Sequence, residues 1–397
     1  MRIIKSIPLL DFASPYPINA MKRILYIILL IACFGCQNKQ SKSDSYSIIE
    51  LKARYGSGDL KQWPAPQLDT SVQDFQEIGS LPPLNLAQDD SIYKAKRLLG
   101  KLLFYDPRLS GSKQIACASC HDPDLGWADG KRVAHGHNRA TGERNTMSIL
   151  NIAYVTSFFW DGRAETLAEQ AREAMENPIE MNQHMQVSVK SVREIPGYVP
   201  YFKQAFGESE ISSEKLLEAL AVFEKSIVSR KSRFDRFIAG DTTQLSNDEV
   251  QGLHLFRTKA RCINCHHSPL FSDGQFHDLG LSYYGRKYED LGRYQVTKKA
   301  EDVGKFRTPS LRELAHTAPY MHNGLFPHLE GIINMYNAGM VSLKPNEAQQ
   351  KDSLFPVKSE LLRPLELTTL EQEQLEAFLL SLSSTIYREP APDQLPQ

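Results

Sequence analysis

The sequence has little that would place the protein across a membrane or on nucleic acid. Beyond the first 40 residues, no apolar run reaches the roughly 20 residues that a membrane-spanning helix needs. Lys and Arg (46) almost balance Asp and Glu (47), so the chain lacks the basic excess of a nucleic-acid-binding protein. No stretch of useful length alternates apolar and polar residues, so a mostly α fold is expected.

The chain has only six cysteines, and four of them fall in two copies of one pattern. Cys-x-x-Cys-His is the attachment site of c-type haem, in which both thiols bond to haem vinyl groups and the adjacent His binds the iron. The copies are Cys117, Cys120 and His121, and Cys262, Cys265 and His266. They predict two covalent haem c groups. The alternatives are a pair of disulfides or zinc half-sites, but zinc usually needs four ligands, and neither copy has a clear second pair, although His267 follows the second.

The other two cysteines, Cys33 and Cys36, end a short apolar run that follows a basic pair. Such a run is typical of a secretory signal, with Met21 as the expected start. Gly35 before Cys36 resembles a bacterial lipoprotein cleavage site, and a plain cleaved signal is the alternative. We therefore expect residues 1–36 to be a signal or lipoprotein segment, and the protein to be periplasmic, held at the membrane only by a lipid on Cys36. Export suits c-type haem, which bacteria attach outside the cytoplasm.

The rest of the chain divides into a tether and two similar halves. Residues 37–78 are rich in polar residues and predict a flexible tether. Each half has an amphipathic helix before its haem motif, a loop-rich middle and a closing amphipathic helix. Capping boxes are expected at Thr166 and Glu169, Ser246 and Glu249, and Thr368 and Glu371. The repeated plan predicts two cytochrome c-like haem domains packed in tandem, at residues 79–245 and 246–388.

Several segments outside the haem motifs resemble one family. They are Phe-Trp-Asp-Gly-Arg-Ala-Glu at 159–165 with Gln170 and Glu180-Met181-Asn182, Phe-Arg-Thr-Pro-Ser-Leu-Arg at 306–312, and Thr-Ala-Pro-Tyr-Met-His at 317–322. Together they resemble the bacterial di-haem cytochrome c peroxidases, whose relatives include MauG, over roughly residues 80–385.

The resemblance implies roles for particular residues. His121 would be the proximal ligand of the peroxidatic haem, with Glu180 as the acid–base residue on its open side and Gln170 lining the same pocket. Trp160 would lie between the two haems and carry electrons between them. The alternatives are a solvated charge at a helix end for Glu180 and an ordinary core residue for Trp160.

The remaining ligands are implied by position in the family. His137 falls where a loop His caps the first iron in the peroxidases, and a surface His is the alternative. His266 would bind the second iron from one side and Tyr336 from the other. Standard peroxidases have Met at the latter position and MauG has Tyr, and here Met335 is adjacent. A calcium ion would be held by the Asn145 side chain and the carbonyls of Thr317 and Pro319.

The resemblance therefore implies an exported enzyme that reduces hydrogen peroxide to water with electrons from a small cytochrome c or a cupredoxin. A MauG-like oxidase of a protein or small-molecule substrate is the alternative enzyme, favoured by Tyr336. A non-enzymatic electron-transfer di-haem cytochrome is the third possibility, and Glu180 and Gln170 argue against it because electron transfer needs no acid–base group. Enzymes of this kind are often homodimers, and no nucleic-acid partner is expected.

Overall fold

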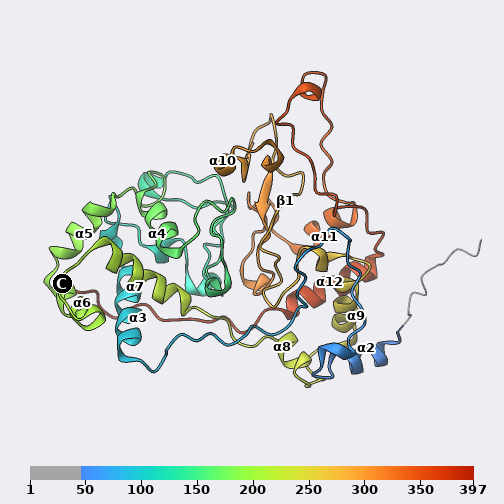
Figure 1. Ribbon diagram of the computed structural model, residues 1–397, viewed down its shortest axis with the longest axis horizontal. Coiled ribbons are helices and arrows are strands. Elements are labelled where there is room, and N and C mark those ends of the chain that lie inside the picture. Colours follow the sequence, from blue (N-terminus) through green and yellow to red (C-terminus); the bar gives the residue numbers. More distant parts are fainter. Residues whose placement is uncertain (1–45) are drawn as a thin grey trace, which may run out of the picture. The chain divides into compact units, whose positions relative to one another are not determined.

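The computed structural model describes residues 46–397, of which Ile48–Gln397 form one compact unit (Figure 1). The predicted signal, the expected start at Met21 and the lipid site at Cys36 lie outside the described residues. Within residues 46–397, no helix is both long enough and apolar enough to cross a membrane. The fold is mostly helical, as predicted, with a single two-stranded antiparallel sheet in the described part.

The first helical group surrounds the first haem motif. It consists of α3 (Ser91–Phe104), α4 (Leu167–Glu176), α5 (Met185–Arg193), α6 (Val199–Phe206) and α7 (Ser213–Lys225). Helices α3 and α7 cross closely (Figure 1). Gly100 makes the crossing possible, because a Cβ there would lie 1.9 Å from the carbonyl oxygen of Ala219. Apolar side chains of this group form one core that includes Leu99, Phe104 and Phe223.

The second group repeats this crossing around the second motif. Its members are α2 (Ile48–Tyr55), α8 (Arg233–Ile238), α9 (Asn247–Arg257), α11 (Leu329–Asn337) and α12 (Thr369–Ser381). Gly252 of α9 allows the same close approach to α12 that Gly100 allows between α3 and α7. A Cβ at Gly252 would lie 1.9 Å from the Gln374 carbonyl oxygen. The same close approach in both groups supports the predicted tandem of two cytochrome c-like haem domains.

The short strands and one short helix lie in the loop-rich middle of the second half. Strand β1 (Phe276–Asp278) pairs with β2 (Lys305–Arg307), and α10 (Tyr294–Thr297) lies between them in the sequence. Strands of three residues are too short to leave an alternating pattern that could be recognised. All three predicted capping boxes are confirmed, at the starts of α4, α9 and α12.

The flexible-tether prediction is wrong from Ile48 onwards. Residues 48–55 form α2, which packs on α9, and the chain after it lies against the second half. There the buried Arg257 pairs with Glu77 and donates 2.6 Å to the carbonyl oxygen of Pro64. These contacts join residues about 180–200 positions apart, so the polar composition of residues 37–78 gave no sign of them.

The predicted domain boundary at residues 245 and 246 also needs correction. Helix α8 precedes that boundary but packs on the second half, where Phe234 contacts the rings of Phe271 and Phe378. Asp235 forms a buried ion pair with Arg312 at 3.0 Å. The change from one half to the other therefore falls earlier, before α8.

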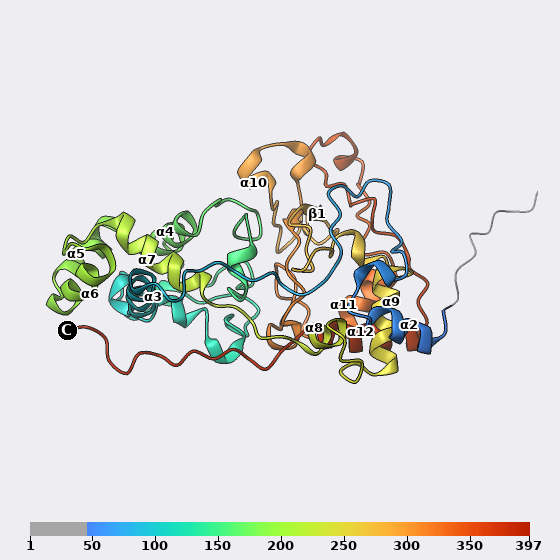
Figure 2. The same cartoon turned by 60° about the horizontal axis from the view of Figure 1, so that its bottom comes forward.

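The chain returns to the first half after α12. Residues 383–397, which we call the return segment, run back to the vicinity of α3 and α6 (Figures 1 and 2). Arg108 donates 2.8 Å to the carbonyl oxygen of Pro396, and the Gly197 amide donates 2.7 Å to that of Gln397. The predicted second domain, which extends to residue 388, thus includes residues that pack on the first half.

Candidate functional site

Both Cys-x-x-Cys-His motifs fold into the same short turn. Each begins with a 3₁₀ turn, Cys117–Ser119 in the first half and Cys262–Asn264 in the second. The amide of His121 donates 3.0 Å to the Cys117 carbonyl, and the amide of His266 donates 2.9 Å to that of Cys262. No disulfide joins any two of the four motif cysteines, which speaks against the disulfide alternative. Burial raises the pKa of the Cys262 thiol to about 12.

Both motif histidines are oriented by a main-chain carbonyl. His121 Nδ1 lies 3.1 Å from the Trp127 carbonyl oxygen, and His266 Nδ1 lies 2.9 Å from that of Phe271. A carbonyl can only accept, so Nδ1 carries the proton and Nε2 keeps a lone pair for a metal. Burial lowers the pKa of both imidazoles, which favours the neutral form that binds iron.

A cavity of about 260 Å³ adjoins the second motif. Its lining is mostly apolar and includes Cys262, Cys265, His266, Tyr336, Trp160 and Arg307. Arg307 is only 5% exposed and forms no ion pair with a carboxylate of residues 46–397. Burial lowers the pKa of its guanidinium to about 10. This cavity fits haem c, because it is apolar and offers two thiols and an oriented imidazole. The haem propionates would supply the negative charge that the Arg307 guanidinium lacks.

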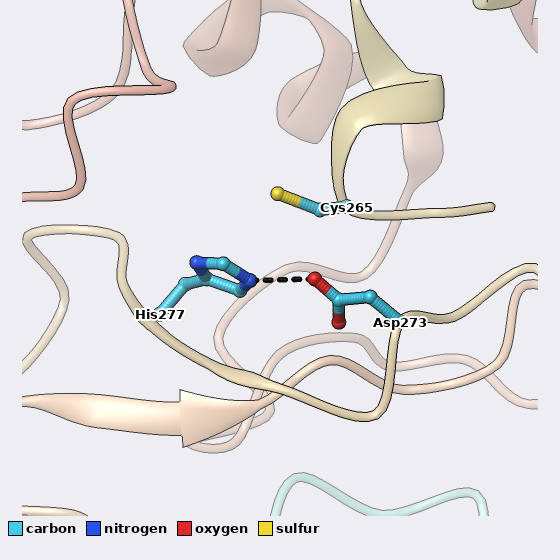
Figure 3. Close-up of side chains that lie close together, drawn as sticks. All are labelled: Cys265, Asp273 and His277. Atoms are coloured by element: carbon cyan, nitrogen blue, oxygen red, sulfur yellow. Dashed lines mark hydrogen bonds and ion pairs between the residues drawn. The ribbon is translucent and has the colours of Figure 1, made fainter. Parts of the chain in front are cut away.

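A cluster beside the second motif resembles a metal site but lacks a full ligand set. The ligand atoms of Cys265, Asp273 and His277 lie within 4.8 Å of one another (Figure 3). His277 Nε2 is already paired with Asp273 at 2.8 Å. Three groups fall short of the four that structural zinc requires, and haem attachment would engage the Cys265 sulfur. The cluster therefore does not support the zinc alternative.

Glu180 lies close to the first motif. It follows α4 in a turn, where the Asn177 side chain donates 2.8 Å to Glu180 Oε1. Burial raises the pKa of Glu180, while Arg163 and Asn177 act in the opposite direction. Burial, Asp129 and Glu180 together raise the pKa of the Cys120 thiol to about 11, which places the Glu180 carboxylate near that thiol. The solvated-charge alternative for Glu180 does not match this environment.

The loop with His137 is pinned to the Glu180 segment. The His137 amide donates 2.7 Å to the Glu180 carbonyl oxygen, and His137 Nδ1 is buried without a hydrogen-bond partner in the described structure. His135 differs, because its Nδ1 lies 3.4 Å from the Thr141 hydroxyl. The histidine beside Glu180 is thus His137, and its role as a ligand stays a prediction. Gln170 is half-buried on α4, and its place in the pocket also stays a prediction, since within residues 46–397 no hydrogen bond joins its side chain to Glu180.

Trp160 lies where the two halves meet. The side chain is 8% exposed and lines the cavity of the second half. Its indole N–H donates 2.9 Å to the Asn145 carbonyl oxygen, and the Trp160 carbonyl accepts a 2.8 Å hydrogen bond from the Arg307 amide. His322 lies edge-on to the indole, with 6.4 Å between ring centroids. This position suits a residue that conducts electrons between halves.

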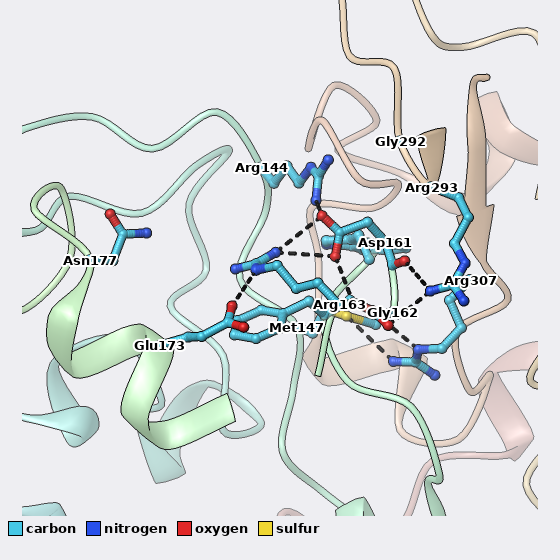
Figure 4. A network of polar contacts seen from close by, with 12 residues as sticks. Arg144, Met147, Asp161, Gly162, Arg163, Glu173, Asn177, Gly292, Arg293 and Arg307 are labelled. Carbon is cyan, nitrogen blue, oxygen red and sulfur yellow. Dashed lines mark hydrogen bonds and ion pairs between the residues drawn. The ribbon is translucent and has the colours of Figure 1, made fainter. Parts of the chain in front are cut away.

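An ion-pair network next to Trp160 joins the halves (Figure 4). Arg144 pairs with Asp161 at 2.5 Å and with Asp290 of the second half at 2.7 Å. Arg163 pairs with Asp161 at 3.2 Å and with Glu173 of α4 at 2.7 Å. The network connects α4, which leads to Glu180, to the second half. Residues 159–165 resemble the family, but the resemblance implied no role for Asp161 or Arg163. Nothing in the sequence around Arg144 indicated its ion pairs.

The predicted calcium ligands lie around one cavity. Asn145, Thr317 and Pro319 all line the cavity of the second half. Asn145 Nδ2 donates 2.9 Å to the Lys131 carbonyl oxygen, which leaves Oδ1 as the side-chain atom that could bind a cation. The calcium site stays a prediction.

The two adjacent candidates for the second distal ligand differ in position. Tyr336 of α11 lines the cavity together with His266 and both cysteines, whereas Met335 does not line it. Burial raises the pKa of the Tyr336 phenol, and so do the Cys265 and Cys262 thiols. The geometry favours Tyr336 as the residue that faces a haem in this cavity.

Tyr336→Phe is therefore expected to change the visible spectrum and the electron spin resonance of the second haem, because a phenyl ring offers iron no ligand atom. Met335→Leu is the matched control, and its spectra should equal those of the wild type. Wild-type spectra for the Tyr336 variant would remove this residue as a ligand.

Two helical halves, each with a Cys-x-x-Cys-His turn and a carbonyl-oriented imidazole, define a tandem c-type cytochrome architecture. A half-buried carboxyl near one motif, that of Glu180, adds a candidate acid–base group to it. The sequence profile described as di-haem cytochrome c peroxidase matches residues 94–243. Together with relatives that are more than 30% identical over most of their length, this match shows that the chain belongs to the di-haem cytochrome c peroxidase and MauG family.

Three relatives illustrate the range of this family. The chain is 39% identical to the methylamine utilization protein MauG of Methylorubrum extorquens, over 76% of this chain and 81% of the relative. It is 37% identical to the cytochrome-c peroxidase IdrP1 of a Pseudomonas species, over 79% of this chain and 87% of the relative. A solved MauG-like protein associated with microbial copper homeostasis superimposes with a TM-score of 0.66 at 30% identity, over 80% of this chain and 96% of the other.

Proposed function

We propose that the protein is an exported peroxidase that reduces hydrogen peroxide to water with electrons from a small redox protein such as cytochrome c. The observation that carries the proposal is Glu180, a carboxyl with a raised pKa that interacts with the Cys120 thiol of the first haem motif. A pure electron carrier has no use for such a group. When bound, haem c supplies the redox-active iron. Two electrons and two protons convert one peroxide molecule into two waters.

The residues of this chain supply proton transfer and orientation. Glu180 takes a proton from one oxygen of the bound peroxide. It then delivers this proton to the other oxygen, which leaves as water. The Asn177 amide holds the carboxylate in place through its 2.8 Å hydrogen bond to Oε1. His121 would hold one iron and His266 the other, each kept in one tautomer by its carbonyl partner. Arg307 would neutralise a propionate in the second half.

Electrons would enter one at a time through the second half and pass by way of Trp160. The position of Trp160 at the cavity wall and next to the ion-pair network supports this route. The proposal includes two haem c groups, the calcium ion between Asn145, Thr317 and Pro319, a periplasmic location with a lipid on Cys36, and a homodimer.

A MauG-like oxidase is the second candidate, in which a protein or small-molecule substrate supplies the electrons. Tyr336 favours it, since this residue and not Met335 lines the second cavity. The 39% identity to a protein named MauG agrees with this alternative.

Steady-state turnover separates the candidates. We expect purified holoprotein with hydrogen peroxide to oxidise reduced cytochrome c or a reduced cupredoxin catalytically, over many equivalents per chain. If peroxide changes the Soret band but neither donor is turned over, the MauG-like alternative stands. If peroxide leaves the Soret band of the oxidised and the half-reduced protein unchanged, both enzymatic proposals fail, and an electron-transfer cytochrome remains.

A further inference from the structure

The carbonyl that orients His121 belongs to a residue with an unusual environment. Trp127 is fully buried, and its oxygen lies 3.1 Å from His121 Nδ1. The indole packs on Phe104 and Phe223 in the core formed by α3 and α7. Because one residue provides both the carbonyl and the buried ring, whatever fixes the ring also fixes the hydrogen bond to the imidazole.

The return segment fixes that ring from the other side. The Trp127 indole N–H donates 2.9 Å to the Tyr387 carbonyl oxygen, and the two rings stack with centroids 6.4 Å apart and planes 19° apart. A buried indole N–H that lost its acceptor would be left unsatisfied, which is costly, so this bond constrains both partners.

Charge holds the return segment against α3. Glu389 is only 8% exposed and pairs with Arg97 and with Lys101, the latter at 3.2 Å. The Tyr387 hydroxyl donates 3.1 Å to the same carboxylate, and the Tyr105 hydroxyl donates 3.3 Å to the Glu389 carbonyl. A buried carboxylate with two cationic partners keeps its place firmly, because leaving it unpaired would be costly.

The other end of the return segment is attached to the second half. Glu313, which is 2% exposed, accepts hydrogen bonds from the Ser384 amide and hydroxyl at 3.0 and 2.9 Å. His316 Nε2 lies 2.8 Å from the Ser384 carbonyl oxygen. The segment is therefore a physical connection between the second half and the residue that orients His121.

Within residues 46–397, no hydrogen bond from the first half fixes the corresponding residue of the second motif. The carbonyl that orients His266 belongs to Phe271, whose ring packs on Phe234, Phe256 and Phe378 within the second half. The two proximal imidazoles thus differ in what supports them. His266 is supported by the core of its own half. His121 is supported by its own core and also by the return segment, which comes from the opposite half.

We propose that residues 383–397 position the proximal ligand of the first haem, by holding Trp127 so that its carbonyl keeps the 3.1 Å hydrogen bond from His121. A hydrogen bond donated by Nδ1 raises the basicity of the imidazole toward iron. Higher basicity stabilises the oxidised iron and lowers its reduction potential. Loosening the return segment therefore raises the potential of the first haem. The inference rests on haem attachment at residues 117–121 and not on the identity of the substrate.

Redox titration of two full-length variants tests the proposal. Trp127→Phe removes the indole donor and keeps an aromatic ring, and Glu389→Gln removes the charge that binds the segment to Arg97 and Lys101. In both variants we expect the midpoint potential of the first haem to rise while that of the second haem stays at its wild-type value. Glu218→Gln is the matched control, because Glu218 pairs with Lys96 of α3 at 2.6 Å without touching the return segment.

Two outcomes would overturn the proposal. One is an unchanged first-haem potential in both variants, and the other is an equal shift in both haems, which would indicate a general loss of structure. If Trp127→Phe does not retain two covalent haems, the titration of Glu389→Gln decides alone. No peroxide is used, so the result stands apart from the outcome of the turnover experiment.

Discussion

Replacing Glu180 with Gln is expected to lower the rate of peroxide turnover by about 10²-fold or more, the usual scale for a lost acid–base group. Gln has nearly the same shape and can still accept from Asn177, but it cannot take up a proton from peroxide. Stopped-flow spectroscopy of the reaction with peroxide, together with steady-state turnover, measures the loss.

The pH dependence gives a second signature of the same residue. Burial raises the pKa of Glu180 above its usual 4.5. The carboxylate form is the one that accepts the proton, so the wild-type rate should fall as the pH drops through this raised pKa. Glu180→Gln should lose that acidic limb. Glu194→Gln, which removes an exposed carboxylate at the end of α5, should keep both the rate and the limb. A wild-type rate in Glu180→Gln would refute the proposed role.

The double substitution Cys262→Ser with Cys265→Ser is expected to remove one of the two covalent haems. Both thioether bonds of that haem would then be absent, while the first motif would be unchanged. Mass spectrometry and the pyridine haemochrome spectrum should report one covalent haem per chain instead of two. Electron entry from the donor protein should be lost with it.

The same variant should be much less stable. A cavity of about 260 Å³ left without its occupant corresponds to a cost of about 6 kcal/mol, at about 24 cal/mol per Å³. Whole domains are stable by only about 5–15 kcal/mol, so the second half should unfold at markedly lower temperature or denaturant concentration. Ile263→Val is the control, since it changes a fully buried residue between the two cysteines and should keep both haems. Two covalent haems in the double variant would contradict the attachment site.

The parts of the fold that could be predicted depend on short-range patterns. Capping boxes and amphipathic spacing are read within a few residues, and all three capping boxes start helices as expected. The haem motifs are equally local. Residues 48–78 and α8 were assigned wrongly because their partners are distant in sequence. The pairing of Glu77 with Arg257 across 180 residues has no local signature.

The candidate site shows the same division. The motif residues followed from spacing, and Glu180 and Trp160 followed only from resemblance to a family. Asn177 lies three residues before Glu180, yet an Asn in a turn is too common to indicate the hydrogen bond that holds the carboxylate. Arg307 belongs to residues 306–312, one of the segments that resemble the family. Only the structure shows that its charge is buried without a carboxylate partner in the described residues.

The route of the chain imposes an order on its biosynthesis. Residues 48–79 pack on the second half, and the return segment packs on the first half. Each half therefore includes a segment that is adjacent in sequence to the other half. A ribosome makes residues 91–225 long before residues 383–397, which complete the surroundings of Trp127. The first half is therefore synthesised first, but its packing around Trp127 is completed only by residues that are synthesised after the second half. A first half that folds by itself therefore leaves the Trp127 indole without its acceptor until the return segment arrives.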